Sequence, residues 1–95
     1  METGHNTLHF VVTKPFGMHA RVCLKWVKAL REVAQGKEGA FWIVYEGKRV
    51  VADSLLELLG QRMGKGAEFD FVYEPDSLLS EQQKALLHEK LQRLI

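Results

Sequence analysis

A segment of five residues, Gly17-Met18-His19-Ala20-Arg21, combines a nucleophile with groups that bind an anion. It follows an alternating segment typical of a strand and precedes a segment of helical periodicity, so His19 lies at the expected start of a helix. Imidazole is a nucleophile near neutral pH. A helix start offers unpaired backbone N–H groups, and an arginine adds a planar fork of donors that fits phosphate oxygens. The segment therefore predicts a site that accepts a phosphoryl group on His19, with Arg21 stabilising the phosphate.

The remaining titratable side chains indicate no competing chemistry. His5, His9 and His88 lack such a setting and are predicted to be surface groups. Cys23 is the single cysteine, so an intramolecular disulfide is excluded, and its place on an apolar helical stripe predicts a core residue. Neither a catalytic triad, nor a carboxylate pair, nor a metal-ligand spacing is present, which argues against a stand-alone hydrolase. We expect no metal and no cofactor.

The composition predicts one domain over residues 7–95, preceded by a flexible N-terminal tail over residues 1–6. Of the 95 residues 46% are hydrophobic, which is enough for a core. The net charge of +1 gives no electrostatic argument for nucleic acid or an anionic membrane as a partner. The polar start lacks a signal-peptide core, and no apolar run approaches the roughly 20 residues of a membrane helix. We therefore expect a cytoplasmic protein with no membrane insertion.

Hydrophobic periodicity and turn residues predict the element order β-α-β-β-α-β-α. Strands are predicted over residues 8–13, 40–45, 48–52 and 68–73, and long helices over residues 19–34 and 80–94. Asp53 or Ser54 can cap a short helix that carries Leu55, Leu56, Leu58 and Leu59. Glu46-Gly47 is typical of a tight hairpin turn, and Ser80 with Gln83 has the spacing of a capping box. These elements form an α+β domain, with helices packed on one face of an antiparallel or mixed sheet whose strand order the pattern leaves open.

The segment around His19 resembles the phosphorylation motif Gly-Leu-His-Ala/Thr-Arg-Pro of HPr, the histidine-containing phosphocarrier proteins of the bacterial phosphotransferase system. Further matches lie at the family's spacing: Gly47-Lys48 where the family has Asn-Gly-Lys, Ala52-Asp53-Ser54-Leu55 at its regulatory serine, Gly66 in the following loop, and Gln83-Lys84-Ala85 at the start of its last helix. The resemblance covers about residues 7–94, and the motifs are specific in combination rather than singly.

The resemblance implies an open-faced β-sandwich, in which three helices cover one face of a four-stranded antiparallel sheet. It implies that Nδ1 of His19 accepts a phosphoryl group from an Enzyme I-type donor and passes it to an EIIA-type acceptor, while Arg21 steadies the phosphate. Such a protein is a relay component of phosphoenolpyruvate-dependent sugar transport or regulation rather than a stand-alone enzyme. We expect a monomer.

The segment after the second hairpin strand has both a structural and a functional interpretation. Ser54 can be a plain helix cap, or it can match the serine that a bifunctional HPr kinase/phosphorylase modifies in some bacteria. A short helix cannot bury leucines on every side, and in the family this patch docks partner proteins. Leu55, Leu56 and Leu59 are therefore predicted to bind partners.

Three departures from the family pattern leave a second function open. Val22 stands where the family has proline, Asp53 places a negative charge beside Ser54 where a basic residue is common, and Arg62 replaces a frequent glycine. The alternative is an HPr-like regulatory binding protein that no longer relays phosphate efficiently. An RNA-reading domain shares the order β-α-β-β-α-β, but residues 48–52 carry none of the aromatic side chains that stack on bases.

Overall fold

The computed structural model describes residues 6–95, and residues 1–5, which include His5 and most of the predicted tail, lie outside this range. The elements are β1 (Thr7–Val11), α1 (Ala20–Ala34), β2 (Ala40–Tyr45), β3 (Lys48–Val51), α2 (Leu55–Gly60), β4 (Glu68–Glu74), the short 3-10 helix η1 (Asp76–Leu78) and α3 (Glu81–Leu94). The predicted element order is confirmed. Asn6 already belongs to the folded part, because its side chain donates a hydrogen bond of 2.6 Å to the carbonyl oxygen of Tyr73.

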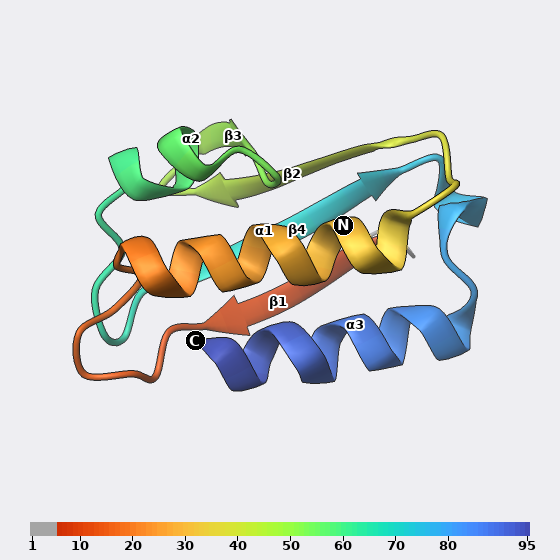
Figure 1. Cartoon of the computed structure of the whole chain (residues 1–95). Helices are drawn as coiled ribbons and strands as arrows, with labels where there is room; N and C mark the ends of the chain where they lie inside the picture. Colours follow the sequence, from red (N-terminus) through yellow and green to blue (C-terminus); the bar gives the residue numbers. More distant parts are fainter. Residues whose placement is uncertain (1–5) are drawn as a thin grey trace.

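The four strands form one antiparallel sheet in the order β1-β4-β2-β3. All three α-helices lie on the same face of this sheet and leave the other face open (Figure 1). The predicted antiparallel sheet with helices on one face is therefore confirmed. The strand order places β4 and β2 at the centre, so β3, which was compared above with a base-stacking strand, is an edge strand.

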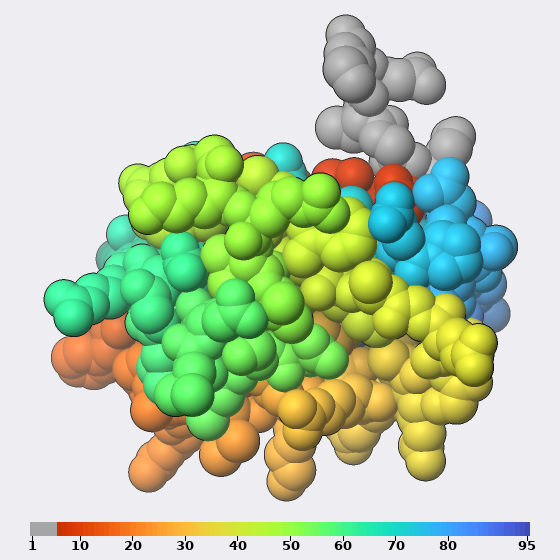
Figure 2. All heavy atoms as spheres, turned by 90° about the horizontal axis from the view of Figure 1, so that it is seen from above, coloured from red at the N-terminus to blue at the C-terminus, as the bar shows by residue number. Residues whose placement is uncertain are grey.

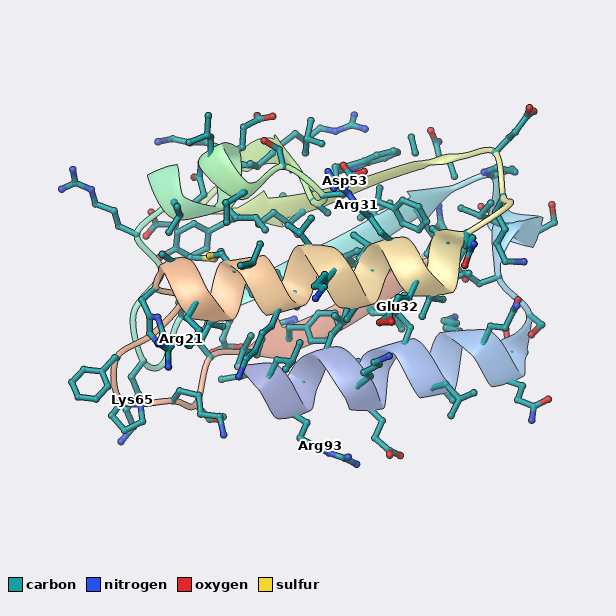
Figure 3. All side chains as sticks on the ribbon, viewed as in Figure 1. Arg21, Arg31, Glu32, Asp53, Lys65 and Arg93 are labelled. Atoms are coloured by element: carbon teal, nitrogen blue, oxygen red, sulfur yellow. The ribbon has the colours of Figure 1, made fainter. Side chains whose placement is uncertain are left out.

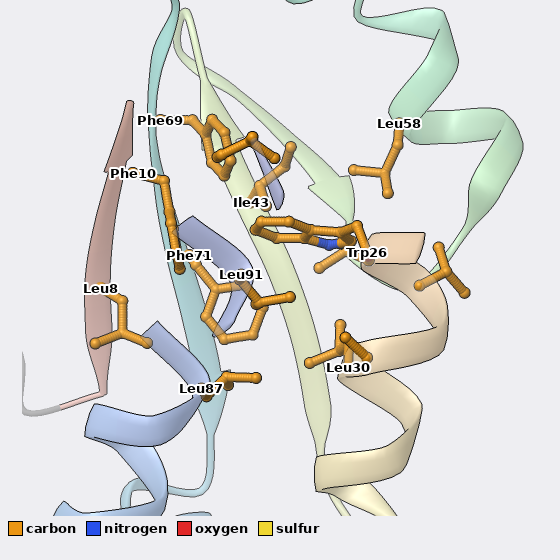
Figure 4. Packing of buried hydrophobic residues seen from close by; sticks show 14 of the residues in the cluster. Leu8, Phe10, Trp26, Leu30, Ile43, Leu58, Phe69, Phe71, Leu87 and Leu91 are labelled. Carbon is orange, nitrogen blue, oxygen red and sulfur yellow. Dashed lines mark hydrogen bonds between the residues drawn. The ribbon is translucent and has the colours of Figure 1, made fainter. Parts of the chain in front are cut away.

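The core lies between the sheet and the helices, as the alternating and helical patterns require. The rings of Phe10 and Trp26 meet edge to face with centroids 5.2 Å apart, so α1 packs directly on the sheet. The Trp26 indole N–H donates to the carbonyl oxygen of Ala52 at 3.0 Å, which also ties α1 to the segment before α2. Figure 4 shows the side chains that the helices contribute to this layer: Trp26 and Leu30 from α1, Leu58 from α2, and Leu87 and Leu91 from α3.

Two local sequence signals form the structures they predict. Glu46 and Gly47 have φ values of 49° and 78°, and this pair of positive φ angles lets the tight turn match the twist of β2 and β3. The Ser80 hydroxyl accepts from the Gln83 backbone N–H at 3.1 Å, while the Gln83 side chain accepts from the Ser80 N–H at 2.9 Å. The capping box that begins α3 is thus complete.

Side chains of α3 form hydrogen bonds with backbone groups on the outer edge of β1. The Gln92 amide donates to the carbonyl oxygen of Val11 at 2.7 Å and accepts from its N–H at 3.1 Å. Nε2 of His88 lies 2.8 Å from the carbonyl oxygen of His9, and its ring stacks on Phe10 at 4.8 Å between centroids. His88 is consequently half-buried, and the prediction of a plain surface group is wrong for it, whereas His9 is exposed as predicted.

Candidate phosphoryl-acceptor site

His19 occupies the N-cap position of α1, directly before the first helical residue. Its backbone is extended (φ −78°, ψ 177°), its side chain is exposed, and its carbonyl oxygen accepts the N–H of Cys23 at 2.9 Å. The ring makes no capping hydrogen bond, and within residues 6–95 the N–H groups of Ala20, Arg21 and Val22 have no acceptor. The predicted position of His19 at a helix start is confirmed. The backbone N–H groups of the first turn, which follow it directly, are free to bind an acceptor.

Gly17 allows the loop before His19 to press against the loop after α2. Its φ is +67°, and a Cβ there would lie 2.5 Å from the carbonyl oxygen of Met63 and 2.7 Å from Cα of Gly64. The neighbouring Met18 N–H donates to that same Met63 oxygen at 2.8 Å. No residue with a side chain fits this close approach without a backbone shift. Gly17 therefore helps to set the position of the backbone that leads into His19.

The other side of the loop is fixed by the last helix. The Lys14 N–H donates to the backbone oxygen of Ile95 at 2.8 Å, and the Thr13 N–H donates to the same atom. The Lys14 carbonyl oxygen then accepts the Gly17 N–H at 3.0 Å and closes a turn. Because Ile95 is fully buried, these bonds hold the loop between the end of α3 and the loop after α2.

His19 lines a hollow of about 260 Å³, and all the charged residues that line it are basic. Its lining comes from the loop before α1, the first two turns of α1 and the end of α3: Lys14, Phe16, His19, Arg21, Val22, Lys25, Arg93 and Leu94. Arg21 lies at the start of α1, whereas the guanidinium of Arg93 points away from α1 and donates to Glu89 at 2.8 Å (Figure 3). The cations raise the local concentration of anions, as a phosphate-accepting site requires.

The structure thus brings His19 and Arg21 together with cations that the sequence reasoning did not assign to the site. Lys14 and Arg93 are separated by nearly the whole chain. They line the same hollow because the end of α3 packs against the loop before α1. Lys14 could have been noticed from its proximity to His19 in the sequence. Nothing in the local pattern around Arg93 indicates its place.

Ser54 and the α2 leucines do not line this hollow. The residue before Ser54 lies beside the last turn of α1, where Arg31 donates to the Asp53 carbonyl oxygen at 3.4 Å. The Ser54 hydroxyl accepts from the Glu57 N–H at 3.4 Å, so the serine caps α2. Of the three predicted partner-binding leucines, Leu56 is 81% exposed, while Leu55 and Leu59 are half-buried and pack against the core. The α2 segment lies beside the start of α1 (Figures 1 and 2).

Of the three departures from the family motif, only Val22 lines the hollow around His19. Val22 packs partly against the core and α1 begins regularly around it. Asp53 uses its carbonyl oxygen to accept from Arg31 at 3.4 Å, and its carboxylate makes no ion pair within the described part of the chain. Arg62 adopts a positive φ of 51°, a conformation that glycine takes at lower cost.

Cys23 is excluded as a nucleophile by its surroundings. It is fully buried in the core, and burial raises the pKa of its thiol to about 11. The thiol donates to the carbonyl oxygen of Met18 at 3.3 Å, which helps to hold the residue before His19. Its predicted role as a core residue is confirmed. Across residues 6–95 no group of three His, Cys, Asp or Glu side chains is placed to hold a metal.

Solved structures with the same architecture are phosphocarrier proteins. A crystal structure of HPr from Thermoanaerobacter tengcongensis matches with a TM-score of 0.69 and 18% identity, over 93% of this chain and 92% of the other. The chain has the HPr fold. HPr of Bacillus anthracis matches at 0.66 and 20% identity over 88% and 93%, and the histidine-containing phosphocarrier protein of Mycoplasma at 0.66 and 14% over 93% and 89%. No protein-family model matches the sequence, and no curated protein is significantly similar to it.

The HPr fold and its surface charges argue against the RNA-reading alternative. The central strand β4 directs Glu68, Asp70 and Glu74 onto the open face of the sheet, where an RNA reader needs aromatic side chains and a positive potential. Trp42 on β2 does reach this face, but the guanidinium of Arg49 covers its ring at 4.1 Å. In the described chain, no helix has the length and apolarity of a membrane span.

Proposed function

We propose that this protein is a phosphocarrier that accepts a phosphoryl group on His19 from an Enzyme I-type donor and passes it to an EIIA-type acceptor in the cytoplasm. The observation that carries the proposal is the exposed His19 ring at the N-cap of α1, in a hollow whose charged residues are all basic. The HPr fold of the chain agrees with it.

The chain's own residues do the work of positioning and charge stabilisation. The lone pair of a ring nitrogen of His19, which the resemblance implies is Nδ1, attacks phosphorus as the bond to the donor's leaving atom breaks. Arg21 donates to the phosphoryl oxygens, and the free N–H groups of the first turn add further donors. A P–N bond keeps the group reactive, so the reverse steps transfer it to the acceptor.

Partner proteins would approach over the start of α1 and the adjoining α2 surface. Leu56 supplies an exposed apolar contact, and Lys25, Lys28 and Arg31 supply an exposed basic face. Electrostatic steering toward acidic partners and rapid release suit a relay, which must exchange two partners in turn. The identity of the acceptor decides whether sugar uptake or a regulatory process follows.

Ser54 is proposed as a secondary, regulatory phosphosite for a kinase of the HPr kinase/phosphorylase type. A phosphate there would meet the first-turn N–H groups of α2, which favours it, and the carboxylates of Asp53 and Glu57, which oppose it. Incubation with a purified kinase of this type tests the proposal by mass, with Ser54→Ala as the control. Absence of a modification under conditions that modify a typical HPr would reduce Ser54 to a helix cap.

The decisive experiment for the relay is phosphorylation of the purified protein by Enzyme I and phosphoenolpyruvate, followed by intact mass at alkaline pH. We expect one acid-labile phosphate that is absent from His19→Ala and present in His9→Ala, a matched exposed histidine on the open face. Phosphate on His19→Ala would refute the assignment. A folded wild-type protein that takes no phosphate, beside an active HPr control, would favour the regulatory binding alternative.

A further inference from the structure

The open face of the sheet carries apolar side chains across its middle. Side chains alternate along each strand, so the neighbours of the buried core residues point away from the helices. The apolar ones that lie side by side on this face are Ala40, Trp42, Val44, Val51 and Val72. All three helices lie on the opposite face (Figure 1), and Val51 is 44% exposed. A partner that covered these side chains would remove apolar surface from water.

Charged side chains flank this apolar strip with opposite signs at opposite edges. One row of paired residues crosses the sheet from β1 to β3: His9, Asp70, Val44 and Arg49. At the β1 end the His9 ring lies 3.0 Å from the Asp70 carboxylate and 2.9 Å from that of Glu68. Two carboxylates outweigh one imidazole, so this acidic cluster is negative whether or not His9 is protonated. At the β3 end Arg49 is exposed and has no ion pair within residues 6–95.

We propose that this face packs against the same face of a second copy of the chain, with Arg49 of each copy on the acidic cluster of the other. A two-fold axis that runs along the strands between β4 and β2 reverses the strand order, so β3 of one copy lies over β1 of the other. The row that ends at Arg49 then lies over its own reverse, which begins at His9 and Asp70. The contact of opposite charges therefore forms twice, once on each side of the axis.

The adjoining row is mostly apolar and is also its own complement. It consists of Thr7, Val72, Trp42 and Val51. Trp42 of one copy consequently faces Val72 of the other. Arg49 leaves its position over the Trp42 ring, 4.1 Å from the centroid, for charge-assisted bonds to carboxylates. Glu46 directly follows β2 and Glu74 ends β4, so both carboxylates lie beyond the two rows and stay in water at the rim.

The size of this face predicts a weak association. Four strands about 4.8 Å apart, with about five residues each at about 3.4 Å per residue, make a face of roughly 19 by 17 Å. Sheets that stack in this way lie about 10 Å apart, with their strands within about 30° of each other. A contact of this size is at the low end of specific interfaces, so the dimer should form at micromolar concentrations or above. The helical side that carries His19 stays outside the contact, so this inference does not depend on the proposed function.

Sedimentation equilibrium of the full chain tests the association from about 10 µM to about 1 mM protein at pH ~7. We expect the weight-average mass to rise from the 10.9 kDa of one chain toward twice that value. Arg49→Glu and Asp70→Lys should each lower the association constant about tenfold or more, because each substitution places like charges together twice in the dimer. An equimolar mixture of the two variants should associate within about threefold of the wild type, since the exchanged charges attract each other again.

Two further substitutions separate this contact from an association through the helical side. Val72→Lys should abolish the association, because it places a charge in the middle of the apolar row. Leu86→Lys is the matched control, since Leu86 is 60% exposed on α3, and it should leave the association constant unchanged. Amide NMR shifts of the wild type, followed on dilution, need no substitution and should change at Val44 and Val72 and not along α1.

A mass that stays near 10.9 kDa at about 1 mM would overturn the inference and leave the monomer expected from the sequence. So would an equal loss of association in Leu86→Lys and Val72→Lys, or a mixture of the two charge variants that does not associate. Stronger association of Arg49→Glu would indicate that an uncovered Trp42 alone causes it, and would likewise refute the charge pairing.

Discussion

Replacing Gly17 by alanine should destabilise the protein through two separable causes. The positive φ of +67° costs an alanine about 1–2 kcal/mol. The new Cβ would also lie 2.5 Å from the Met63 carbonyl oxygen, so the backbone must shift and weaken the Met18 N–H bond to that oxygen, whose net value is about 1 kcal/mol. We expect Gly17→Ala to lower the free energy of unfolding by about 2–4 kcal/mol in total.

Gly36→Ala is the matched control for the conformational cost alone. Gly36 has a φ of +77°, and a Cβ there would meet no atom within 4 Å. Its substitution should cost about 1 kcal/mol, since the left-handed penalty is partly offset by the smaller entropy of the unfolded alanine chain. The difference between the two variants therefore measures the close approach of the two loops.

Urea denaturation of both variants, with the slope of the transition compared to that of the wild type, gives the two free energies. Under conditions where both variants remain folded, Gly17→Ala should also accept phosphate more slowly from Enzyme I, because His19 is displaced, while Gly36→Ala should not. Equal destabilisation within about 0.5 kcal/mol would show that the loops are not packed as tightly as the geometry implies, and the explanation of how His19 is positioned would fail.

Four further predictions follow from single side chains. Arg62→Gly should raise the free energy of unfolding by about 0.5–1 kcal/mol in urea denaturation, because it relieves a positive φ of 51°. Hydrogen bonds to Asp70 and, second, to Glu68 raise the pKa of His9 above its ordinary value of 6.5. The stabilisation that protonated His9 contributes should therefore be complete below pH 6.5 and be lost as the pH rises through the pKa of the folded state. His9→Gln should flatten this pH dependence of the free energy of unfolding. Gln92→Leu should cost about 1–2 kcal/mol, as it leaves the Val11 N–H and carbonyl without their partners, while the exposed Gln82→Leu should cost far less in the same assay. The Cys23 thiol, with its pKa raised to about 11, should resist alkylation at pH ~8 in the native protein and react once urea unfolds it; rapid native labelling would contradict its burial.

The elements and the position of His19 could be predicted because their causes are local. A glycine break, a capping position and a helical stripe follow one another directly along the chain, and the capping box of Ser80 and Gln83 spans a single turn. The strand order could not be predicted, because pairing β1 with β4 joins segments from opposite ends of the chain. The cationic lining contributed by Lys14 and Arg93, and the half-buried state of His88, depend on the same long-range return of α3.

The hydrogen bonds between α3 side chains and β1 reduce the tendency of the sheet to aggregate through its edge. An open antiparallel sheet with a bare outer face invites further strands at both edges and, from there, fibres. Here Gln92 bonds to the Val11 N–H and carbonyl oxygen, and His88 bonds to the His9 carbonyl oxygen, along one edge. The other edge strand, β3, has only four residues, of which Lys48 and Arg49 are charged. Both edges are therefore poor templates for a further strand, although the outer face of the sheet stays bare of helices.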